Sequence, residues 1–444
     1  MLWRGLSGGP SRVAPGLRLQ AGDPPEGVTV AVPGDKSVTH RALLLGLLAR
    51  GTTQVSAPLL ALDTLRSLEV TRAFGARVTE RPGELIIESP GLGSLREPDQ
   101  VIDCGNSGTT MRLAAGIAAT VPGLTVLTGD ASLRRRPMVR VTGPLQVLGV
   151  TSWTRAGGSA PIAVRGGAIR GGRVNLPVAS AQVKSALLLA GLAADGPVTV
   201  VEPVSTRDHT ERMLRAQGID VAVAGGAATV HPGTPAPVAV KVPGDPSSAA
   251  FWWAWAAVRG GRVVTDGVLL NPGRTGFLQV LRRMGAVVTE EVAEETVEPV
   301  GRVTVAGPQR LGPVTIDGSE VPSLVDELPL VAVLATQAEG HSLVTGAGEL
   351  RVKESDRIQA MGDALRAMGA EVSDRRDGWA IEGGGPLGAA TVDALGDHRV
   401  AMALLVAATR ATGPVTLLGA DAVSVSYPGF VEKFVAAGAL RAVR

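Results

Sequence analysis

A glycine recurs along the chain where an apolar, helix-like segment gives way to a β-rich one. One glycine after a last helical turn is an ordinary left-handed cap, but repetition at a near-constant interval indicates copies of one structural unit. Neighbouring copies are 67 to 84 residues apart, at Gly75, Gly149, Gly218, Gly285, Gly369 and Gly438. We therefore predict six units of about 70 residues in which strands and helices alternate, and so an α/β fold.

A second repeat groups these units. The stretch VPGDKS at residues 32–37 returns as VPGDPS at residues 242–247, an interval of 210 residues or three units. Each copy follows a β-like run and opens an apolar helix, and we expect Trp252, Trp253 and Trp255 of the second helix to fill a core. The sequence thus predicts two similar domains of three units each, with a cleft between them.

Composition excludes several classes of protein. With 58 Gly and 30 Pro among 444 residues, the chain is rich in turns but not of low complexity. Its longest stretch without a charged residue, residues 221–240, contains proline, glycine and histidine, so we expect no membrane span. A formal net charge of only +2 does not suit a nucleic-acid binder.

The single cysteine, Cys104, excludes an intramolecular disulfide and a zinc site made of several cysteines. We expect it to be buried, and it fits a reducing compartment such as the cytoplasm. Residues 1–22 contain arginines but no acidic residue, as a transit peptide would. Because glycine and proline interrupt any amphipathic helix there and no apolar secretion segment exists, we expect a loose extension instead.

Cationic residues gather where strands lead into helices, a place where backbone N–H groups and the helix dipole favour anions. Each such segment alone is also typical of an ordinary capped helix with solvated charges. Together they supply cations from both halves of the chain: Lys36, Arg41, Arg112, Arg136, Arg207, Lys353, Arg357 and Arg399. If these helix starts face one cleft, its ligands combine phosphate and carboxylate, which arginine holds through paired hydrogen bonds.

We expect repulsion among these cations to keep the two halves apart until ligand binds. Asp326 and Glu354 stand among them and are candidates for acid–base chemistry. We expect Lys353 and Arg357 to share one face of the helix that residues 351–357 open. No metal-binding spacing and no nucleotide fingerprint occurs in the sequence, so we expect neither a metal nor a cofactor.

Eight motifs stand in a fixed order along the chain: GDKSVTHRALLL, DCGNSGTTMRL, RRRPM, SAQVKSALLLAGL, STRDHTERML, VDELP, RVKESDR and GDHRVAM. In this order, from about residue 30 to the C-terminus, the chain resembles the 5-enolpyruvylshikimate-3-phosphate synthase family. The resemblance implies two domains, each of three βαβαββ units, joined by two crossover strands. On this sequence the domains would span residues 34–242 and residues 243–444 together with 1–33.

The resemblance also implies a reaction. The family transfers the enolpyruvyl group of phosphoenolpyruvate to the 5-hydroxyl of shikimate 3-phosphate and releases phosphate, by addition and elimination through a tetrahedral intermediate. This step of the shikimate pathway leads to chorismate and the aromatic amino acids. Both substrates are polyanions, as the set of cations requires. We expect a cytoplasmic monomer that acts on small molecules and that glyphosate inhibits in competition with phosphoenolpyruvate.

Roles for individual residues follow from the resemblance, motif by motif. Asp326 would take the proton of the 5-hydroxyl, and Glu354, with Lys353 nearby, would be the acid at the methylene carbon. Phosphoenolpyruvate would contact Lys36, Gly108, Arg136, Gln182, Arg357 and Arg399. Shikimate 3-phosphate would contact Lys36, Ser37, Arg41, Ser180, Gln182, Arg207, Asp326 and Lys353. Gly108, having no Cβ, would leave room for the longer glyphosate molecule.

The chain departs from the best-known form of the family at Ala181, Glu349 and Val425, which resemble a second branch and leave the contacts there open. Two alternatives remain. An enolpyruvyl transferase acting on UDP-N-acetylglucosamine would need Lys-Asn at residues 36–37 and a cysteine in the loop before Arg136, and neither occurs. An RNA 3′-phosphate cyclase would need a nucleophilic histidine and a strongly salt-dependent affinity for RNA.

Overall fold

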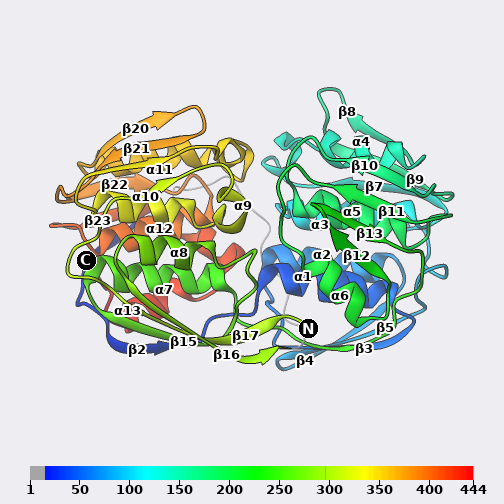
Figure 1. Ribbon diagram of the computed structural model, residues 1–444, viewed down its shortest axis with the longest axis horizontal. Coiled ribbons are helices and arrows are strands. Elements are labelled where there is room, and N and C mark those ends of the chain that lie inside the picture. Colours follow the sequence, from blue (N-terminus) through cyan, green and yellow to red (C-terminus); the bar gives the residue numbers. More distant parts are fainter. Residues whose placement is uncertain (1–15, 296, 444) are drawn as a thin grey trace.

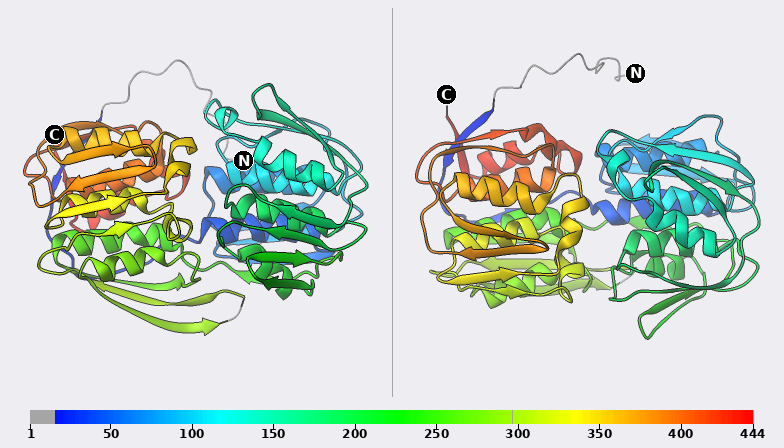
Figure 2. Two further views of the ribbon diagram at one scale, coloured as in Figure 1. Left: turned by 45° about the horizontal axis from the view of Figure 1, so that its top comes forward. Right: turned by 90° about the horizontal axis from the view of Figure 1, so that it is seen from above.

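The computed structural model describes residues 16–295 and 297–443 of the chain. These residues form two lobes side by side (Figure 1). The N-terminal lobe holds the helices and sheets built mainly before residue 242, and the C-terminal lobe holds those built mainly after it. Strands lie toward the outside of each lobe and helices are stacked within it (Figure 2).

The described residues form six four-stranded sheets that share one topology. In each sheet a parallel pair of strands is followed by two antiparallel pairs. This recurrence confirms the predicted α/β fold of six units in two similar halves.

The sheets of the N-terminal lobe have the strand orders β14 (Ala239–Lys241), β3 (Gly51–Ser56), β5 (Glu84–Ser89), β4 (Arg77–Arg81); β6 (Ile102–Asp103), β7 (Gly123–Thr128), β9 (Ser159–Gly166), β8 (Thr151–Arg155); and β10 (Gly172–Asn175), β11 (Val198–Val201), β13 (Ala227–Val230), β12 (Val221–Ala224). Those of the C-terminal lobe are β2 (Glu26–Val30), β15 (Arg262–Leu269), β17 (Pro299–Ala306), β16 (Val287–Glu295); β18 (Thr315–Ile316), β19 (His341–Val344), β21 (Gly378–Glu382), β20 (Glu371–Arg375); and β22 (Ala390–Asp393), β23 (Val415–Leu418), β1 (Leu17–Ala21), β24 (Leu440–Ala442).

The helices of the N-terminal lobe are α1 (Lys36–Leu48), α2 (Leu62–Ala73), α3 (Gly108–Ala119), η1 (Leu133–Arg135), α4 (Val139–Val147), α5 (Ala181–Gly191) and α6 (His209–Ala216). Those of the C-terminal lobe are α7 (Pro246–Arg259), α8 (Gly276–Arg283), α9 (Val321–Leu324), α10 (Leu328–Thr336), η2 (Gly348–Val352), α11 (Arg357–Ala367), α12 (His398–Ala408), η3 (Ala420–Val425) and α13 (Phe430–Ala436). Among residues 16–295 and 297–443, no helix combines the length and apolar character needed to cross a bilayer.

The six repeated glycines stand just after α2, α4, α6, α8, α11 and α13, and their φ angles lie between 82° and 106°. A side chain is strained in this left-handed region, so glycine ends each helix and turns the chain into the next strand. The reading of these glycines as helix caps is confirmed.

Each lobe has its own apolar core. Trp252, Trp253 and Trp255 of α7 are at most 1% exposed and belong to the core of the C-terminal lobe, as expected. Cys104 is fully buried in the core of the N-terminal lobe, and this burial raises the pKa of its thiol. It is therefore a packing residue and not a nucleophile.

Two crossover segments connect the lobes. Strand β2 pairs with β15 of the C-terminal lobe before the chain enters α1, and β14 pairs with β3 of the N-terminal lobe before the chain enters α7 (Figure 1). The segments lie side by side, since the Asp35 amide donates to the Pro243 carbonyl at 2.7 Å and the Asp245 amide to that of Pro33 at 2.9 Å. The repeated VPGD stretch thus forms the paired segments that follow β2 and β14 and connect the lobes.

The expectation of a loose N-terminal extension is wrong for residues 17–21. They form β1, which pairs antiparallel with β23 and β24, and Leu19 is 1% exposed in the core of the C-terminal lobe. The reason is topological, because the sixth unit takes this strand from the start of the chain instead of from its own sequence. Residues 1–15 lie outside the described part of the chain.

Candidate active site

A cavity of about 270 Å³ lies between the lobes, and the starts of several helices line it. All but one of the site residues expected from the sequence line this cavity: Lys36, Ser37, Gly108, Arg136, Ser180, Gln182, Arg207, Asp326, Lys353, Glu354, Arg357 and Arg399. The helix starts of both halves therefore do face one cleft, as their cations suggested.

Side-chain caps already occupy many of the backbone N–H groups at these helix starts. Asp35 accepts from the Val38 amide at 2.7 Å, and Asp397 accepts from the Arg399 amide at 2.8 Å. Ser180 caps α5 in the same way. Ordinary helix capping therefore uses these backbone N–H groups. An anion in the cleft must be held mainly by the cationic side chains that line it.

Arginines of the N-terminal lobe meet carboxylates of the C-terminal lobe across the cleft. Three pairs do so: Arg207 with Asp326 at 2.7 Å, Arg136 with Glu354 at 3.4 Å, and Arg140 with Glu349 at 2.6 Å. The Ser132 hydroxyl also donates to the Glu354 carbonyl at 3.1 Å. The two lobes are therefore in direct contact across the cleft in this structure. The cations of one lobe face both acids and cations of the other lobe. The attraction between the opposite charges holds the two halves together.

The two acid–base candidates are held as carboxylates. Burial opposes ionisation of Asp326, but Arg207, Lys353 and further cations outweigh it and keep its pKa well below the usual range. Burial also opposes ionisation of Glu354, but Arg357 and Arg136 outweigh this effect and keep the pKa of Glu354 well below the usual range. In this arrangement both groups can accept protons, and neither carries one to donate.

The segment around Glu354 differs from the sequence expectation. Lys353 and Glu354 lie in the turn between η2 and α11, not on a helix, so Lys353 and Arg357 do not share a helical face. Arg357 is the first residue of α11, and its guanidinium contacts Asp397 at 2.8 Å and Glu354 at 2.7 Å. These contacts fix the direction in which Arg357 points.

Besides Arg112, which donates to Gln182, two cations of the cleft have no ion-pair partner among the described residues. Lys353 is one, and burial lowers its pKa. Arg399 is the other, and its guanidinium lies over the Phe251 ring at 5.9 Å from the centroid. Next to them, both ring nitrogens of His398 lack a hydrogen-bond partner, and burial, with Lys36 and Arg399, lowers its pKa well below the usual range. These three groups are available to a ligand.

Gln182 is positioned by N-terminal-lobe residues. The Arg112 guanidinium donates to Gln182 Oε1 at 2.5 Å, and Gln182 Nε2 donates to Thr109 Oγ1 at 2.9 Å. Burial, together with Arg136, lowers the pKa of Arg112 to about 10, still well above neutrality. Gly108 stands beside them: a Cβ on it would lie 3.1 Å from Arg112 Nη1 and 3.2 Å from Arg136 Nη1.

Arg41 is the expected site residue that the structure does not bring into the cleft. Its guanidinium donates to Thr210 Oγ1 at 2.7 Å, to Ser185 Oγ at 2.9 Å and to the carbonyl of Ser37 at 3.0 Å. Arg41 lies one helical turn after Ser37 on α1, and its side chain points to Thr210 and Ser185, outside the lining of the cleft. Through its hydrogen bond to the Ser37 carbonyl, Arg41 holds the backbone at Ser37 in place.

Sequence reasoning missed Arg274, which lines the cleft from the loop after β15. Its guanidinium contacts Asp35 at 2.8 Å and Asp245 at 2.9 Å, and also reaches Ser37 and Ser247 at 3.4 and 3.0 Å. It therefore joins the two VPGD stretches. No motif surrounds Arg274 in the sequence, so its role as a bridge between Asp35 and Asp245 is visible only from these contacts.

The three departures from the best-known pattern have different surroundings. Ala181 lines the cleft as the first residue of α5, and Glu349 lines it paired with Arg140. Val425 ends η3 and is not among the residues that line the cavity. Among the described residues, no group of three histidine, cysteine or acidic side chains is arranged to hold a metal ion.

Comparison with known proteins gives a consistent result. Residues 21–434 match the family model described as EPSP synthase (3-phosphoshikimate 1-carboxyvinyltransferase). A 3-phosphoshikimate 1-carboxyvinyltransferase of Herpetosiphon aurantiacus is 47% identical over 412 residues, which cover 91% of this chain and 95% of that protein. One from Anaeromyxobacter sp. (strain K) is 50% identical over 405 residues, covering 90% and 91%. The solved structure of EPSP synthase from Acinetobacter baumannii superposes with a TM-score of 0.85 at 39% identity, covering 97% of this chain and 100% of that one.

Proposed function

This chain belongs to the EPSP synthase family and is a transferase of the shikimate pathway, and we propose that its cleft joins phosphoenolpyruvate to shikimate 3-phosphate by addition and elimination. The observation that carries the proposal is the meeting of an ionised carboxylate, Asp326, with cations of both lobes at one cavity. A site of this kind binds polyanions and keeps one group ready to take a proton.

The addition step begins at the 5-hydroxyl of shikimate 3-phosphate. Asp326 takes the hydroxyl proton while the oxygen bonds to C2 of phosphoenolpyruvate, and the methylene carbon C3 receives a proton from Glu354 with Lys353 nearby. In the elimination step the tetrahedral intermediate returns a proton from C3, the C2–O bond to phosphate breaks, and the enolpyruvyl ether forms. Protons balance, because the proton placed on C3 in the first step returns to Glu354 in the second, and the hydroxyl proton taken by Asp326 passes to the departing phosphate, which leaves as hydrogen phosphate.

Glu354 has to be protonated to act in the first step, although its pKa is depressed without ligand. Arg357 and Arg136 are the cations mainly responsible for the depression. In the proposal the carboxylate and phosphate of phosphoenolpyruvate bind these same two arginines. Their positive charge is then shared with the ligand, which raises the pKa of Glu354 toward the range where it can donate.

The other residues of the cleft are proposed to bind one or both of the two substrates. Phosphoenolpyruvate lies against Lys36, Gly108, Arg136, Gln182, Arg357 and Arg399, and the unpaired Arg399 takes its charge without first losing a partner. Shikimate 3-phosphate lies against Lys36, Ser37, Ser180, Gln182, Arg207, Asp326 and Lys353. Arg41 acts through Ser37, whose backbone it holds. Binding of shikimate 3-phosphate separates Arg207 from Asp326, which frees the base for the hydroxyl.

The proposal also covers the domain boundaries, the oligomeric state, the cellular compartment and the inhibitor. The domains span residues 34–242 and residues 243–444 with 1–33, and the cleft is complete within one chain, as a monomer requires. A lone buried cysteine suits a cytoplasmic enzyme. Glyphosate is proposed to occupy the phosphoenolpyruvate position.

Phosphate release tests the function directly. The purified chain should release phosphate from phosphoenolpyruvate when shikimate 3-phosphate is present. It should release none with UDP-N-acetylglucosamine in its place. Equal release with the two acceptors, or release with neither, would contradict the proposed substrate pair.

A further inference from the structure

Arg207 lies in a loop that precedes α6 and has no regular secondary structure of its own. On the N-terminal side of Arg207, Thr206 is held within the same lobe: its hydroxyl donates to Glu202, and its carbonyl accepts from Lys184 Nζ at 3.4 Å. The guanidinium of Arg207 meets Asp326 of the other lobe. Under the proposed function this ion pair separates when shikimate 3-phosphate binds, so the direction of Arg207 then depends on the backbone that carries it.

On its C-terminal side, the loop is held from the C-terminal lobe. Asn271, which follows β15, donates from Nδ2 to Asp208 Oδ1 at 2.7 Å. Asp208 is the residue after Arg207 and belongs to the N-terminal lobe. A hydrogen bond to a carboxylate is stronger than one between neutral groups. One such bond from the opposite lobe therefore fixes the chain next to an arginine that is proposed to bind substrate.

The segment that carries Asn271 also packs on Arg207 itself. Residues 271–274 have the sequence Asn-Pro-Gly-Arg, and the Asn271 side-chain oxygen accepts from the Gly273 amide at 2.8 Å. A Cβ on Gly273 would lie 3.4 Å from Arg207 Cα and 3.8 Å from Arg207 Cγ. The turn of the C-terminal lobe thus lies against the backbone of the arginine as well as holding its neighbour.

The far end of this turn is anchored. The Asn271 carbonyl accepts from the Arg274 amide at 2.8 Å, and the buried Arg274 guanidinium is paired with Asp35 and Asp245. Breaking a buried ion pair by moving one partner away is strongly unfavourable. Asn271 therefore donates to Asp208 from a fixed position.

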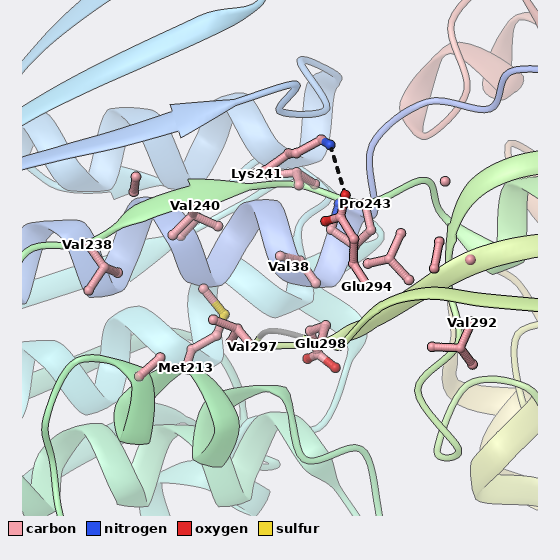
Figure 3. Close-up of a pocket in the computed structure, with 18 of the residues that line it drawn as sticks. Val38, Met213, Val238, Val240, Lys241, Pro243, Val292, Glu294, Val297 and Glu298 are labelled. Atoms are coloured by element: carbon pink, nitrogen blue, oxygen red, sulfur yellow. Dashed lines mark ion pairs between the residues drawn. The ribbon is translucent and has the colours of Figure 1, made fainter.

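A second carboxylate shares the Asn271 donor and holds the start of α6. Glu298 Oε2 accepts from Asn271 Nδ2 at 2.8 Å, and Glu298 Oε1 lies 2.6 Å from Nδ1 of His209, the first residue of α6. Figure 3 shows Glu298 beside Val297, in the hairpin that joins β16 to β17. Asn271, His209 and Glu298 are each at most 4% exposed. The residue two positions after Arg207 is thus held by the same buried cluster.

The chemistry of the asparagine side chain matches these contacts. Its nitrogen donates to the two carboxylates of Asp208 and Glu298, and its oxygen accepts from the Gly273 amide, so both polar atoms of the amide are used. Asn271 is not among the residues that line the cleft. Its influence on a substrate must therefore pass through Asp208 and Arg207.

We propose that Asn271 is a positioning residue for shikimate 3-phosphate: from the C-terminal lobe it holds Asp208, and through Asp208 the backbone that directs Arg207 into the cleft. The inference rests on the proposed function, in which Arg207 contacts this substrate. Affinity for shikimate 3-phosphate thereby depends on a contact between the lobes that lies outside the cleft. Phosphoenolpyruvate has no proposed contact with this segment and is held independently of it.

The dissociation constant of shikimate 3-phosphate tests the proposal, measured by isothermal titration calorimetry on the full chain at pH 7. Asn271→Ala should raise it by about five- to fiftyfold, because Asp208 loses its donor and Arg207 its fixed backbone. Asn175→Ala is the matched control, since this asparagine is exposed at the end of β10, and should change the constant by less than about twofold. Equal constants for wild type and Asn271→Ala, or an equal rise in the control, would overturn the proposal.

Kinetics and a double variant separate positioning from general damage. In Asn271→Ala the KM for shikimate 3-phosphate should rise, while kcat and the KM for phosphoenolpyruvate change by less than about threefold. A chain that is only less stable would show a lower kcat and an unchanged KM, and this pattern would overturn the proposal. In an Arg207→Ala background, Asn271→Ala should weaken shikimate 3-phosphate binding by no more than about twofold further. The same fold-change in both backgrounds would mean that Asn271 does not act through Arg207.

A second variant and the wild type complete the test. If Asn271→Ala does not fold, Asp208→Ala removes the same hydrogen bond at a side chain that is 34% exposed, and it should raise the dissociation constant similarly. No rise in Asp208→Ala would overturn the proposal. A wild-type chain that binds shikimate 3-phosphate and releases phosphate, beside a variant of equal affinity, contradicts the positioning role alone. A wild-type chain that does neither contradicts the proposed function and, with it, this role.

Discussion

The two walls of the cleft carry different chemistry. The N-terminal lobe presents mainly cations, and its lining carboxylate, Asp63, is paired within the same lobe with Lys36 at 3.0 Å. The C-terminal lobe presents the acids Asp326, Glu349 and Glu354, together with cations of its own. Each of these acids meets an arginine of the other lobe.

This asymmetry lets the two walls of the cleft attract each other. Arg136 and Arg207, which are proposed to hold substrate anions, are paired with carboxylates of the opposite wall, whereas Lys353 and Arg399 have no ion-pair partner among the described residues. Under the proposed function, binding exchanges partners: substrate phosphate and carboxylate take the places of Asp326 and Glu354 beside these arginines. On this view the N-terminal wall mainly binds and the C-terminal wall mainly reacts.

The largest effect should come from removing the base of the C-terminal wall. Asp326→Ala should lower kcat by roughly 10²–10⁴, the usual share of a general base, and leave substrate binding measurable. Steady-state kinetics with both substrates decide this. Glu349→Gln is the matched control, because it removes another C-terminal acid that faces an arginine but has no part in proton transfer. An unchanged kcat in Asp326→Ala would remove the base from the mechanism.

A change on the N-terminal wall should act on binding instead. Gly108→Ala would press a methyl group against Arg112 and Arg136, and the longer glyphosate should lose more than phosphoenolpyruvate. Overpacking of this kind costs about 1–3 kcal/mol, which is roughly fivefold to over a hundredfold in Ki for glyphosate. The KM for phosphoenolpyruvate should rise less. Inhibition assays at fixed phosphoenolpyruvate compare the two proteins, and equal Ki values would exclude Gly108 as the determinant.

A third comparison uses pH. Burial lowers the pKa of Lys353, so its positive charge is lost at a lower pH than that of an ordinary lysine. Arginine stays charged throughout this range, and Lys353→Arg should therefore move the alkaline limb of kcat/KM to higher pH. The limb is measured from kcat/KM profiles of both proteins, with Lys433→Arg as a control outside the cleft. A limb at the same pH in wild type and Lys353→Arg would show that another group sets it.

The smallest effect should come from the cross-cleft pair that includes neither proton-transfer group. Arg140 and Glu349 are both about one-third exposed, and pairs of this kind contribute roughly 0.2–1 kcal/mol. Arg140→Gln should thus change either KM by no more than about fivefold. It should also make the ligand-free chain slightly larger in solution scattering. A loss of kcat like that of Asp326→Ala would contradict the division between binding and reacting walls.

Much of the site could be predicted from the sequence, for a physical reason. Helix starts combine a capping residue with its neighbours along the chain, so Lys36 and Ser37, or Asp397 and Arg399, are placed by local geometry once the helix is known. The turn that holds Lys353 and Glu354 cannot be told from the start of the helix by its sequence, because charged residues carry little information about where a helix begins. For Arg41, the partners of the guanidinium depended on Thr210 and Ser185 of other elements, which the sequence around Arg41 does not indicate.

By itself the sequence determined the six units, their glycine caps and the doubled VPGD stretch, because these follow from the backbone needs of each turn and repeat with each copy. Only the tertiary structure decided that β1 completes the sixth sheet, that Arg274 joins Asp35 to Asp245, and that Arg207 faces Asp326. Arg274 and Asp35, for example, are 239 residues apart. Such contacts depend on how the lobes pack, and no local pattern in the chain encodes which distant partner a charge will meet.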